Sequence, residues 1–249
     1  MFGIEYLENE ANLRTGITPS LIARYTTGQS LGLKAFYRIQ LPALWSAVSI
    51  NAAATTSGAR IEALSTPHES LTGVPVGTAR LGYELNLQKV QAKLGVSGLY
   101  GPRNDQRNPE VKQLAVGADL RISFFGFSLW GEIIRLIDEP GIAAGKITGM
   151  GSYELASGFT VTGMYLTAAW TLPFTAGHFD HLTIYGRYDH RRAKFEGFGQ
   201  LEVDRFTAGF RVDLFGQLAI KAEYLVNREI AGASDVPNDV FTSSAVFSW

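Results

Sequence analysis

Segments of about ten residues in which apolar and polar side chains alternate recur along the chain, and this period of two constrains the fold more than any other feature. In the segment 203–215, Phe206 and Phe210 share one parity, whereas Arg205 and Arg211 share the other. Successive side chains of a β-strand point to opposite faces of its sheet. Each such segment therefore predicts a strand with one apolar face and one polar face.

The alternating segments predict an all-β, antiparallel fold of about twelve strands in a single domain that spans residues 1–249. The segment 127–138 is the least regular, because Glu132 and Arg135 fall on opposite parities. Either a β-bulge near Ile133 corrects the register, or Arg135 points outward and extends its charged end to the rim of a membrane. The expected strands lie at 2–8, 31–41, 44–56, 78–87, 89–101, 110–124, 127–138, 159–173, 181–194, 203–215, 217–230 and 239–249.

Short and long connections alternate between the expected strands. Short turns at one end and long loops at the other are typical of outer-membrane β-barrels, whereas a soluble sandwich has no reason to separate its connections in this way. We therefore expect an antiparallel transmembrane β-barrel in a bacterial outer membrane. Short turns are expected at 41–43, 87–88, 125–126, 173–180 and 215–216, and long polar loops at 57–77, 102–109, 139–158, 195–202 and 231–238.

The composition agrees with a membrane barrel and excludes several other classes. The 249 residues include no cysteine, which excludes a disulfide scaffold, a cysteine zinc site, an iron–sulfur cluster and a cysteine nucleophile. The net charge is −1, so nucleic acid is not an expected partner. The uncharged stretches 39–59 and 155–179 are long enough to cross a bilayer as helices, but their proline, serine and threonine content disfavours that reading.

The chain ends on an amphipathic segment with an aromatic last residue. Phe241, Ala245, Phe247 and Trp249 share one parity. This ending resembles the signal that the outer-membrane assembly machinery of Gram-negative bacteria reads, so that machinery is an expected partner through Trp249. The ending also sets an orientation in which the short turns face the periplasm and the long loops face outward, with aromatic side chains at the membrane interface.

Several scattered motifs resemble one porin family. The stretch 2–7 reads Phe-x-x-Glu-x-Leu, and the segments 20–25 and 28–33 follow it. Together with the pieces at 94–101, 131–132, 204–214, 219–224 and 227–229, this text resembles the phosphate-selective porin O and P family. The resemblance implies a sixteen-stranded barrel, of which about four strands precede this chain, and a homotrimer. The alternative is a closed barrel of twelve strands.

The resemblance also implies that the first long loop folds into the pore. Arg14 and Arg24 lie in this stretch and are the candidate residues of an inward loop. A short helical turn near 19–25 would fit, because Pro19 stands at a first-turn position. The alternative is that both arginines are ordinary solvated loop residues.

The polar parity of the expected strands would face the interior of a barrel. An excess of cations there favours anions, because a low-dielectric wall focuses the electric field. The alternative is that the charges pair across neighbouring strands, as Arg187 with Asp189 or Arg211 with Asp213. The candidate pore-lining residues are Lys34, Arg38, Lys93, Arg121, Arg187, Arg191, Arg205, Arg211 and Lys221; Arg80 and Lys89 are assigned with them, against the acids Glu84, Asp119, Glu132, Asp189, Asp213 and Glu223.

We expect a porin that allows passive diffusion of small, preferentially anionic solutes through a water-filled barrel, without a catalytic residue, a metal or a cofactor. One alternative is a non-conducting structural or complex-associated barrel whose loops fill the interior. An outer-membrane hydrolase is another, although no serine stands at a spacing that forces a pair with His68, His178, His181 or His190. The last alternative is a soluble β-protein.

Outer-membrane lipid and lipopolysaccharide are further expected partners. Arg191, Arg192 and Lys194 form a basic run that we expect at the outer rim, where it would bind lipopolysaccharide phosphates. The alternative is that this run is simply solvated.

Overall fold

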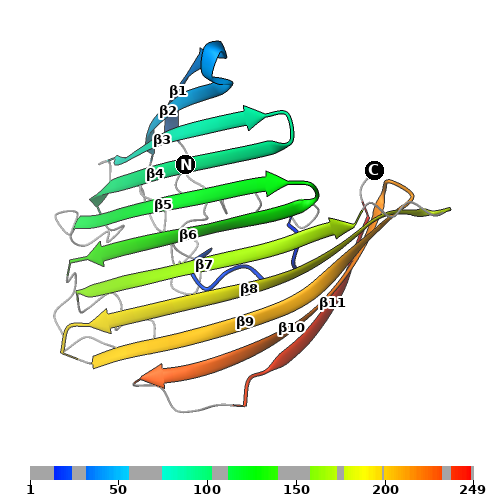
Figure 1. Ribbon diagram of the computed structural model, residues 1–249. Helices are drawn as coiled ribbons and strands as arrows, with labels where there is room; N and C mark the ends of the chain where they lie inside the picture. Colours follow the sequence, from blue (N-terminus) through cyan, green and yellow to red (C-terminus); the bar gives the residue numbers. More distant parts are fainter. Residues whose placement is uncertain are drawn as a thin grey trace.

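The computed structural model describes residues 14–23, 32–55, 75–102, 112–139, 158–172, 177–197, 199–231 and 237–247. Its strands form one sheet in which each strand pairs antiparallel with its neighbours in the chain (Figure 1). The strands are β1 (Gly32–Leu41), β2 (Ser46–Thr55), β3 (Val76–Leu87), β4 (Val90–Pro102), β5 (Lys112–Phe124), β6 (Phe127–Asp138), β7 (Phe159–Leu172), β8 (Phe179–Phe195), β9 (Gly199–Leu214), β10 (Leu218–Ala231) and β11 (Val240–Phe247); a short 3-10 helix, η2 (Pro42–Leu44), follows β1.

The predicted all-β antiparallel fold is confirmed for the described part of the chain. Eleven of the expected strands are present, with bounds within a few residues of those predicted. The strand predicted at 2–8 and the terminal Trp249 lie outside the described residues. β1 and β11 are the two edges of the sheet and are not paired with each other, so the described sheet is open and not closed into a barrel.

The two faces of the sheet differ in character. We call inner the face against which segment 14–23 lies, drawn in dark blue in Figure 1, and outer the opposite face. The outer face exposes a large apolar side chain on every strand; Val96 on β4, Ile133 on β6 and Phe206 on β9 are 54%, 50% and 50% exposed. Water-soluble monomers rarely expose a continuous apolar surface of this kind.

The inner face combines charged side chains with a buried apolar cluster on β6 and β7. Ile134, Leu136, Phe159 and Val161 belong to this cluster, and Ile22 of segment 14–23 joins it with no exposed surface. Burial of an isoleucine side chain contributes roughly 1.5–3 kcal/mol. The cluster therefore helps to hold the segment against the sheet.

The connections are sorted by length, with one exception. We call turn end the edge of the sheet at which β1, β3, β5, β7 and β9 end, and loop end the edge at which β2, β4, β6, β8 and β10 end. The long loop predicted at 195–202 is wrong, because β8 ends only at Phe195 and β9 already begins at Gly199. In this extension the polar side chains change from the inner to the outer face: Arg192 and Glu202 are outer and charged, whereas Val203 is inner and apolar. The alternation seen in the rest of each strand is broken there, and the sequence pattern therefore did not predict the extension.

The bulge predicted near Ile133 is also wrong. Ile133 pairs with Ala118 on β5 and with Met164 on β7 in an unbroken register. Glu132 consequently points inward and is buried. Arg135 lies on the outer face near the loop end, as the alternative interpretation expected. The described residues include no helix that is both long enough and apolar enough to cross a membrane.

Candidate functional site on the inner face

Segment 14–23 is attached to the inner face through its backbone amides. The N–H groups of Ile17 and Thr18 donate to the two carboxylate oxygens of Glu223 on β10, at 2.9 and 2.7 Å. The N–H of Leu21 donates to Asp189 Oδ1 on β8 at 3.0 Å. Backbone donors outside regular secondary structure need such partners when they leave water. The two buried carboxylates therefore act as docking points for the segment.

The carbonyl groups of the segment accept from cations of the same strands. Arg187 on β8 donates to Thr18 O at 2.9 Å and to Pro19 O at 3.3 Å. Arg211 on β9 and Lys221 on β10 both donate to Arg14 O, at 3.1 and 2.5 Å. Three of the predicted pore-lining cations are thus engaged with the backbone of the inward segment.

Tyr185 completes this arrangement from β8. Its hydroxyl donates to Glu223 Oε2 at 2.6 Å. An added Cβ on Gly209, its neighbour on β9, would lie only 2.6 Å from that hydroxyl oxygen. Glycine at 209 therefore gives the tyrosine ring the room to reach Glu223.

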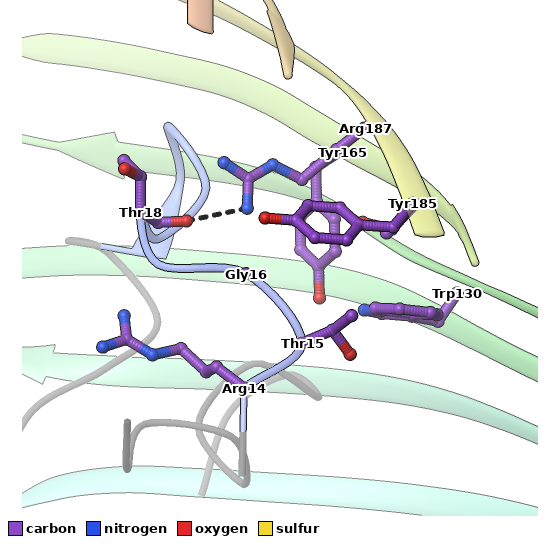
Figure 2. Close-up of a pocket in the computed structure, with 9 residues that line it drawn as sticks. Arg14, Thr15, Gly16, Thr18, Trp130, Tyr165, Tyr185 and Arg187 are labelled. Atoms are coloured by element: carbon purple, nitrogen blue, oxygen red, sulfur yellow. Dashed lines mark hydrogen bonds between the residues drawn. The ribbon is translucent and has the colours of Figure 1, made fainter. Parts of the chain in front are cut away.

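A small cavity remains between the segment and the sheet (Figure 2). Thr15 and Thr18 line it from the segment, and Trp130, Tyr165 and Tyr185 line it from the strands. Its volume of about 30 Å³ is enough for one or two water molecules. The segment is therefore fitted closely to the inner face and leaves no room for a larger ligand in this cavity.

Ion pairs engage several of the other inner cations. Arg38 contacts Glu84 at 2.7 Å, and Lys93 contacts the same carboxylate at 3.5 Å. Arg80 forms two hydrogen bonds with the buried carboxylate of Asp119, one of them at 2.7 Å. Most of the positive charge of these three side chains is therefore neutralised by carboxylates in direct contact with them.

The pairs that the sequence left open are formed within single strands. Arg187 contacts Asp189 at 2.8 Å along β8, and Arg211 contacts Asp213 at 2.7 Å along β9. Side chains two residues apart on a strand share a face. Charges of the inner face therefore pair with one another, but Arg187 and Arg211 find their partners on their own strands.

The remaining predicted cations are distributed over the same face. Lys34 on β1 and Arg191 on β8 have the inner parity. Arg121 on β5 lies over the Trp130 ring at 5.5 Å, and Arg205 on β9 donates to Asn227 Oδ1 at 2.8 Å. Among the described residues, Arg191 and Arg205 have no carboxylate within 4.0 Å.

Two details of the charge assignment need correction. Lys89 lies in the turn 88–89, over the Phe125 ring at 5.3 Å, and not on the inner face. Asp138 and Glu229 have the inner parity and were missed, because they stand at the loop end of their strands. The excess of cations on the inner face is therefore smaller than the sequence indicated.

The other candidate residues fall in separate places. Arg14 is in the inward segment, and its Nε is buried without a hydrogen-bond partner among the described residues. Arg24 and His68 lie outside the described residues. The His178 ring contacts Phe215 at the turn end in a tilted arrangement, with ring centres 4.6 Å apart. In the described ranges no group of three or more histidine and acidic side chains is placed to hold a metal.

A hydrolase motif was overlooked in the sequence and is placed only in part. Residues 28–32 read Gly-Gln-Ser-Leu-Gly, the pattern of a nucleophile elbow. Only Gly32 of this stretch is described, and it opens strand β1. His190, the candidate base, points to the outer face, where its Nδ1 lies 2.8 Å from Asp204 Oδ1.

No protein-family model matches this chain, and no curated protein matches it. The resemblance of its motifs to the porin O and P family stays a prediction.

Proposed function

We propose that this protein is an outer-membrane β-barrel porin, resembling the phosphate-selective porin O and P family, through which small and preferentially anionic solutes diffuse. Segment 14–23 narrows the water-filled interior. The observation that carries this proposal is the contrast between the faces: an exposed apolar outer face opposite a charged inner face that holds an inward segment. A soluble sheet would bury its apolar face and expose its charged one.

The distribution of charge on the outer face supports a membrane location. Apart from Asp180 at the irregular start of β8, outer charges of the described strands stand near the loop end, as Arg135, Arg192 and Arg228 do. Closer to the turn end, every outer side chain in 206–214 of β9 and in 218–226 of β10 is uncharged. These stretches match the 9–11 residues that a tilted strand needs to cross the hydrocarbon layer, where an outward lysine or arginine costs about 2–4 kcal/mol.

The inner face supports weak anion preference. Most inner cations are paired or hold the segment, whereas Arg191 and Arg205 lack a carboxylate contact in the described residues. Their field acts on solutes in a narrow lumen with low-dielectric walls. Selection would then occur by electrodiffusion past these two arginines, without chemistry on the solute.

The expected partners belong to this proposal. They are the outer-membrane assembly machinery, reached through Trp249; outer-membrane lipid and lipopolysaccharide; and two further copies of the chain in a homotrimer. The single-domain reading of residues 1–249 and the bacterial outer-membrane location are proposed with them.

A planar bilayer experiment tests the porin directly. The refolded protein should give a steady conductance, with a reversal potential across a KCl gradient that indicates anion preference. Because the chain has no cysteine, Pro19→Cys introduces a unique thiol on an exposed residue of the inward segment. A charged, water-soluble thiol reagent should reduce the conductance of this variant.

The control places the same thiol on the outer face. Ala208→Cys should stay unmodified in the bilayer, because lipid covers that position in the proposed arrangement. If the reagent modifies Ala208→Cys and leaves the conductance of Pro19→Cys unchanged, the proposals that segment 14–23 lies in the lumen and that the outer face lies in lipid are both rejected.

The alternative of a non-conducting barrel has an observation in its favour, since segment 14–23 is bound along β8–β10 by several hydrogen bonds. A protein that inserts, migrates on gels as a heat-modifiable barrel and yet carries no current would establish this alternative. A variant that releases the segment would then be expected to conduct.

A further inference from the structure

We propose that the outer face of β8–β10 binds a phosphorylated glycolipid of the outer leaflet, with an acyl chain in an apolar groove and a phosphate against cations at the loop end. The inference rests on the proposed function, because it requires this face to lie in a membrane. Two adjoining features of the same three strands build the site: the outer groove and the charged belt.

Small residues hollow the outer groove. Gly186 on β8 lies opposite Ala208 on β9, which lies opposite Tyr224 on β10. A Cβ on Gly186 would meet its nearest atom, Thr207 O, only at 3.9 Å, so the glycine leaves open space. The resulting groove has a volume of about 400 Å³. Its surface is mostly apolar, from the side chains and ring faces of Tyr188, Phe206, Ala208, Tyr224 and Val226, and Arg187 and Thr207 also border it. Such a groove suits a hydrocarbon chain and offers little to a polar ligand.

The charged belt begins one outer row nearer the loop end. It consists of His190, Arg192 and Lys194 on β8, Glu202 and Asp204 on β9, and Arg228 on β10. The Arg192 side chain is 55% exposed, whereas those of Glu202 and Asp204 are 22% and 19% exposed. A headgroup that approaches the belt therefore meets mainly cations.

Neighbours within the belt occupy its carboxylates. Asp204 Oδ1 accepts from the Tyr188 hydroxyl at 3.0 Å and lies 2.8 Å from His190 Nδ1. Glu202 Oε2 accepts from Gln200 Nε2 at 3.0 Å. Arg192 also contacts Glu202 at 3.9 Å and donates to Gln200 Oε1 at 2.6 Å. Its side chain nevertheless stays 55% exposed, so the belt still presents this cation to an approaching phosphate.

Tyr188 marks the boundary between the groove and the belt. Its ring packs against Phe206, with centres 5.0 Å apart, while its hydroxyl reaches Asp204. Tyrosine takes this position where one end of the side chain is in an apolar medium and the other is in water. The boundary coincides with the depth at which a lipid changes from acyl chain to headgroup.

The spacing along the strands fits one amphiphilic molecule. Tyr224 in the groove and Arg228 in the belt are four residues apart, which is about 13 Å along a strand. The predicted lipopolysaccharide contact changes accordingly: Arg191 points inward and is lost from it, whereas Arg228 joins Arg192 and Lys194 from two strands away. A glycolipid is favoured over a phospholipid because the loop end faces outward in the proposed orientation.

The test uses the full chain refolded in detergent and native mass spectrometry to count retained lipid A, with phosphatidylglycerol and phosphatidylcholine as competitors. Replacing the belt cations together (Arg192→Gln, Lys194→Gln, Arg228→Gln) should weaken lipid A retention about a hundredfold. Filling the groove (Gly186→Leu, Ala208→Leu) should also weaken it, with the cations intact. The matched controls, Arg135→Gln and Ala118→Leu, change an outward cation and an outward alanine elsewhere and should retain lipid A fully.

Three results would overturn the inference: equal loss in the controls, phosphatidylglycerol retained as well as lipid A, or a groove variant that binds normally. Bilayer insertion and conductance of every variant separate this failure from that of the proposed function. A protein that conducts but does not retain lipid A rejects the glycolipid site alone. A protein that neither inserts nor conducts rejects both.

Discussion

Single side chains hold the inward segment through contacts that are remote in the sequence. Glu223 accepts from Ile17, Thr18 and Tyr185 at 2.6–2.9 Å, and from the Thr242 hydroxyl at 3.4 Å. Hydrogen bonds to a charged acceptor are stronger than neutral ones. The carboxylate at 223 is therefore the point at which a one-atom change should release the segment most selectively.

Glu223→Gln should loosen segment 14–23 and raise the single-channel conductance. The amide keeps the shape of the side chain but replaces one acceptor oxygen by a donor, which costs about 2 kcal/mol of docking free energy. Glu84→Gln is the control, because it makes the same charge change next to Arg38 and Lys93, away from the segment. An equal rise in both variants would show that charge, and not docking, controls the current.

Gly163→Ala should displace the other end of the segment. The added Cβ would lie 2.4 Å from Ile22 Cγ2 and 3.1 Å from His190 O. Overpacking of this kind costs roughly 1–3 kcal/mol. Limited proteolysis of the refolded protein should cut within 14–23 faster than in the wild type. Gly98→Ala, whose Cβ meets nothing within 4 Å, should digest as the wild type does, and faster cutting there would contradict the argument.

At the scale of elements, the tight turns depend on backbone angles that favour glycine. Phe125 and Gly126 join β5 to β6 with φ of 47° and 80°, and two successive residues of positive φ are typical of a two-residue hairpin turn that matches the twist of the strands. Phe215 and Gly216 repeat this pattern between β9 and β10. A bulky aromatic in this region costs about 1–2 kcal/mol, which the turn sustains because it places the ring at the edge of the apolar surface.

Gly126→Ala should destabilise the protein more than Gly177→Ala. Both glycines have positive φ, so each alanine carries a backbone cost of about 1 kcal/mol. Only at 126 does the new Cβ also approach a backbone atom, Thr171 O, at 2.6 Å, whereas at 177 nothing lies within 4 Å. Gel shifts on heating should show a lower unfolding temperature for Gly126→Ala. Equal unfolding temperatures for the two variants would mean that the turn accommodates the added Cβ at 126 without loss of stability.

The sequence predicts the strands well but predicts the contacts of the segment poorly, for a physical reason. Alternation is local, so the bounds of β6 or β10 follow from ten consecutive residues. It fails at 190–204, where polarity reverses between the faces although backbone pairing continues. The bond from Ile17 to Glu223 joins residues 206 positions apart, and no local pattern encodes such a partner. Arg14 was placed in the right segment, but the role of its carbonyl was not foreseen.

For the whole molecule, the odd number of described strands bears on whether the sheet can close into a barrel. In a meander of eleven strands the first and the last run in the same direction, so joining β1 to β11 would make a parallel seam. Single-chain bacterial barrels have an even number of antiparallel strands. The proposed barrel therefore needs an odd number of further strands between β1 and β11. The strand predicted at 2–8 would supply one, and the sixteen-stranded alternative would supply five.

The net charge of the inner face should set the ion selectivity of the proposed barrel. Replacing Arg191 and Arg205 together by glutamine removes two cations that have no carboxylate contact in the described residues. A unit charge about 4 Å away is worth about 1 kcal/mol in water, so each loss should lower the anion preference by up to about fivefold. The measurement is the reversal potential across a KCl gradient.

The control removes a complete ion pair, Arg80 with Asp119, by combining Arg80→Gln with Asp119→Asn. This double variant has the same net charge as the wild type, so the two proteins should have the same reversal potential. If the neutral double variant shifts the potential as much as the loss of Arg191 and Arg205, selectivity arises from pore geometry and not from uncompensated charge. If neither variant shifts it, the current does not pass along this face of the sheet, and segment 14–23 closes the interior instead of narrowing it.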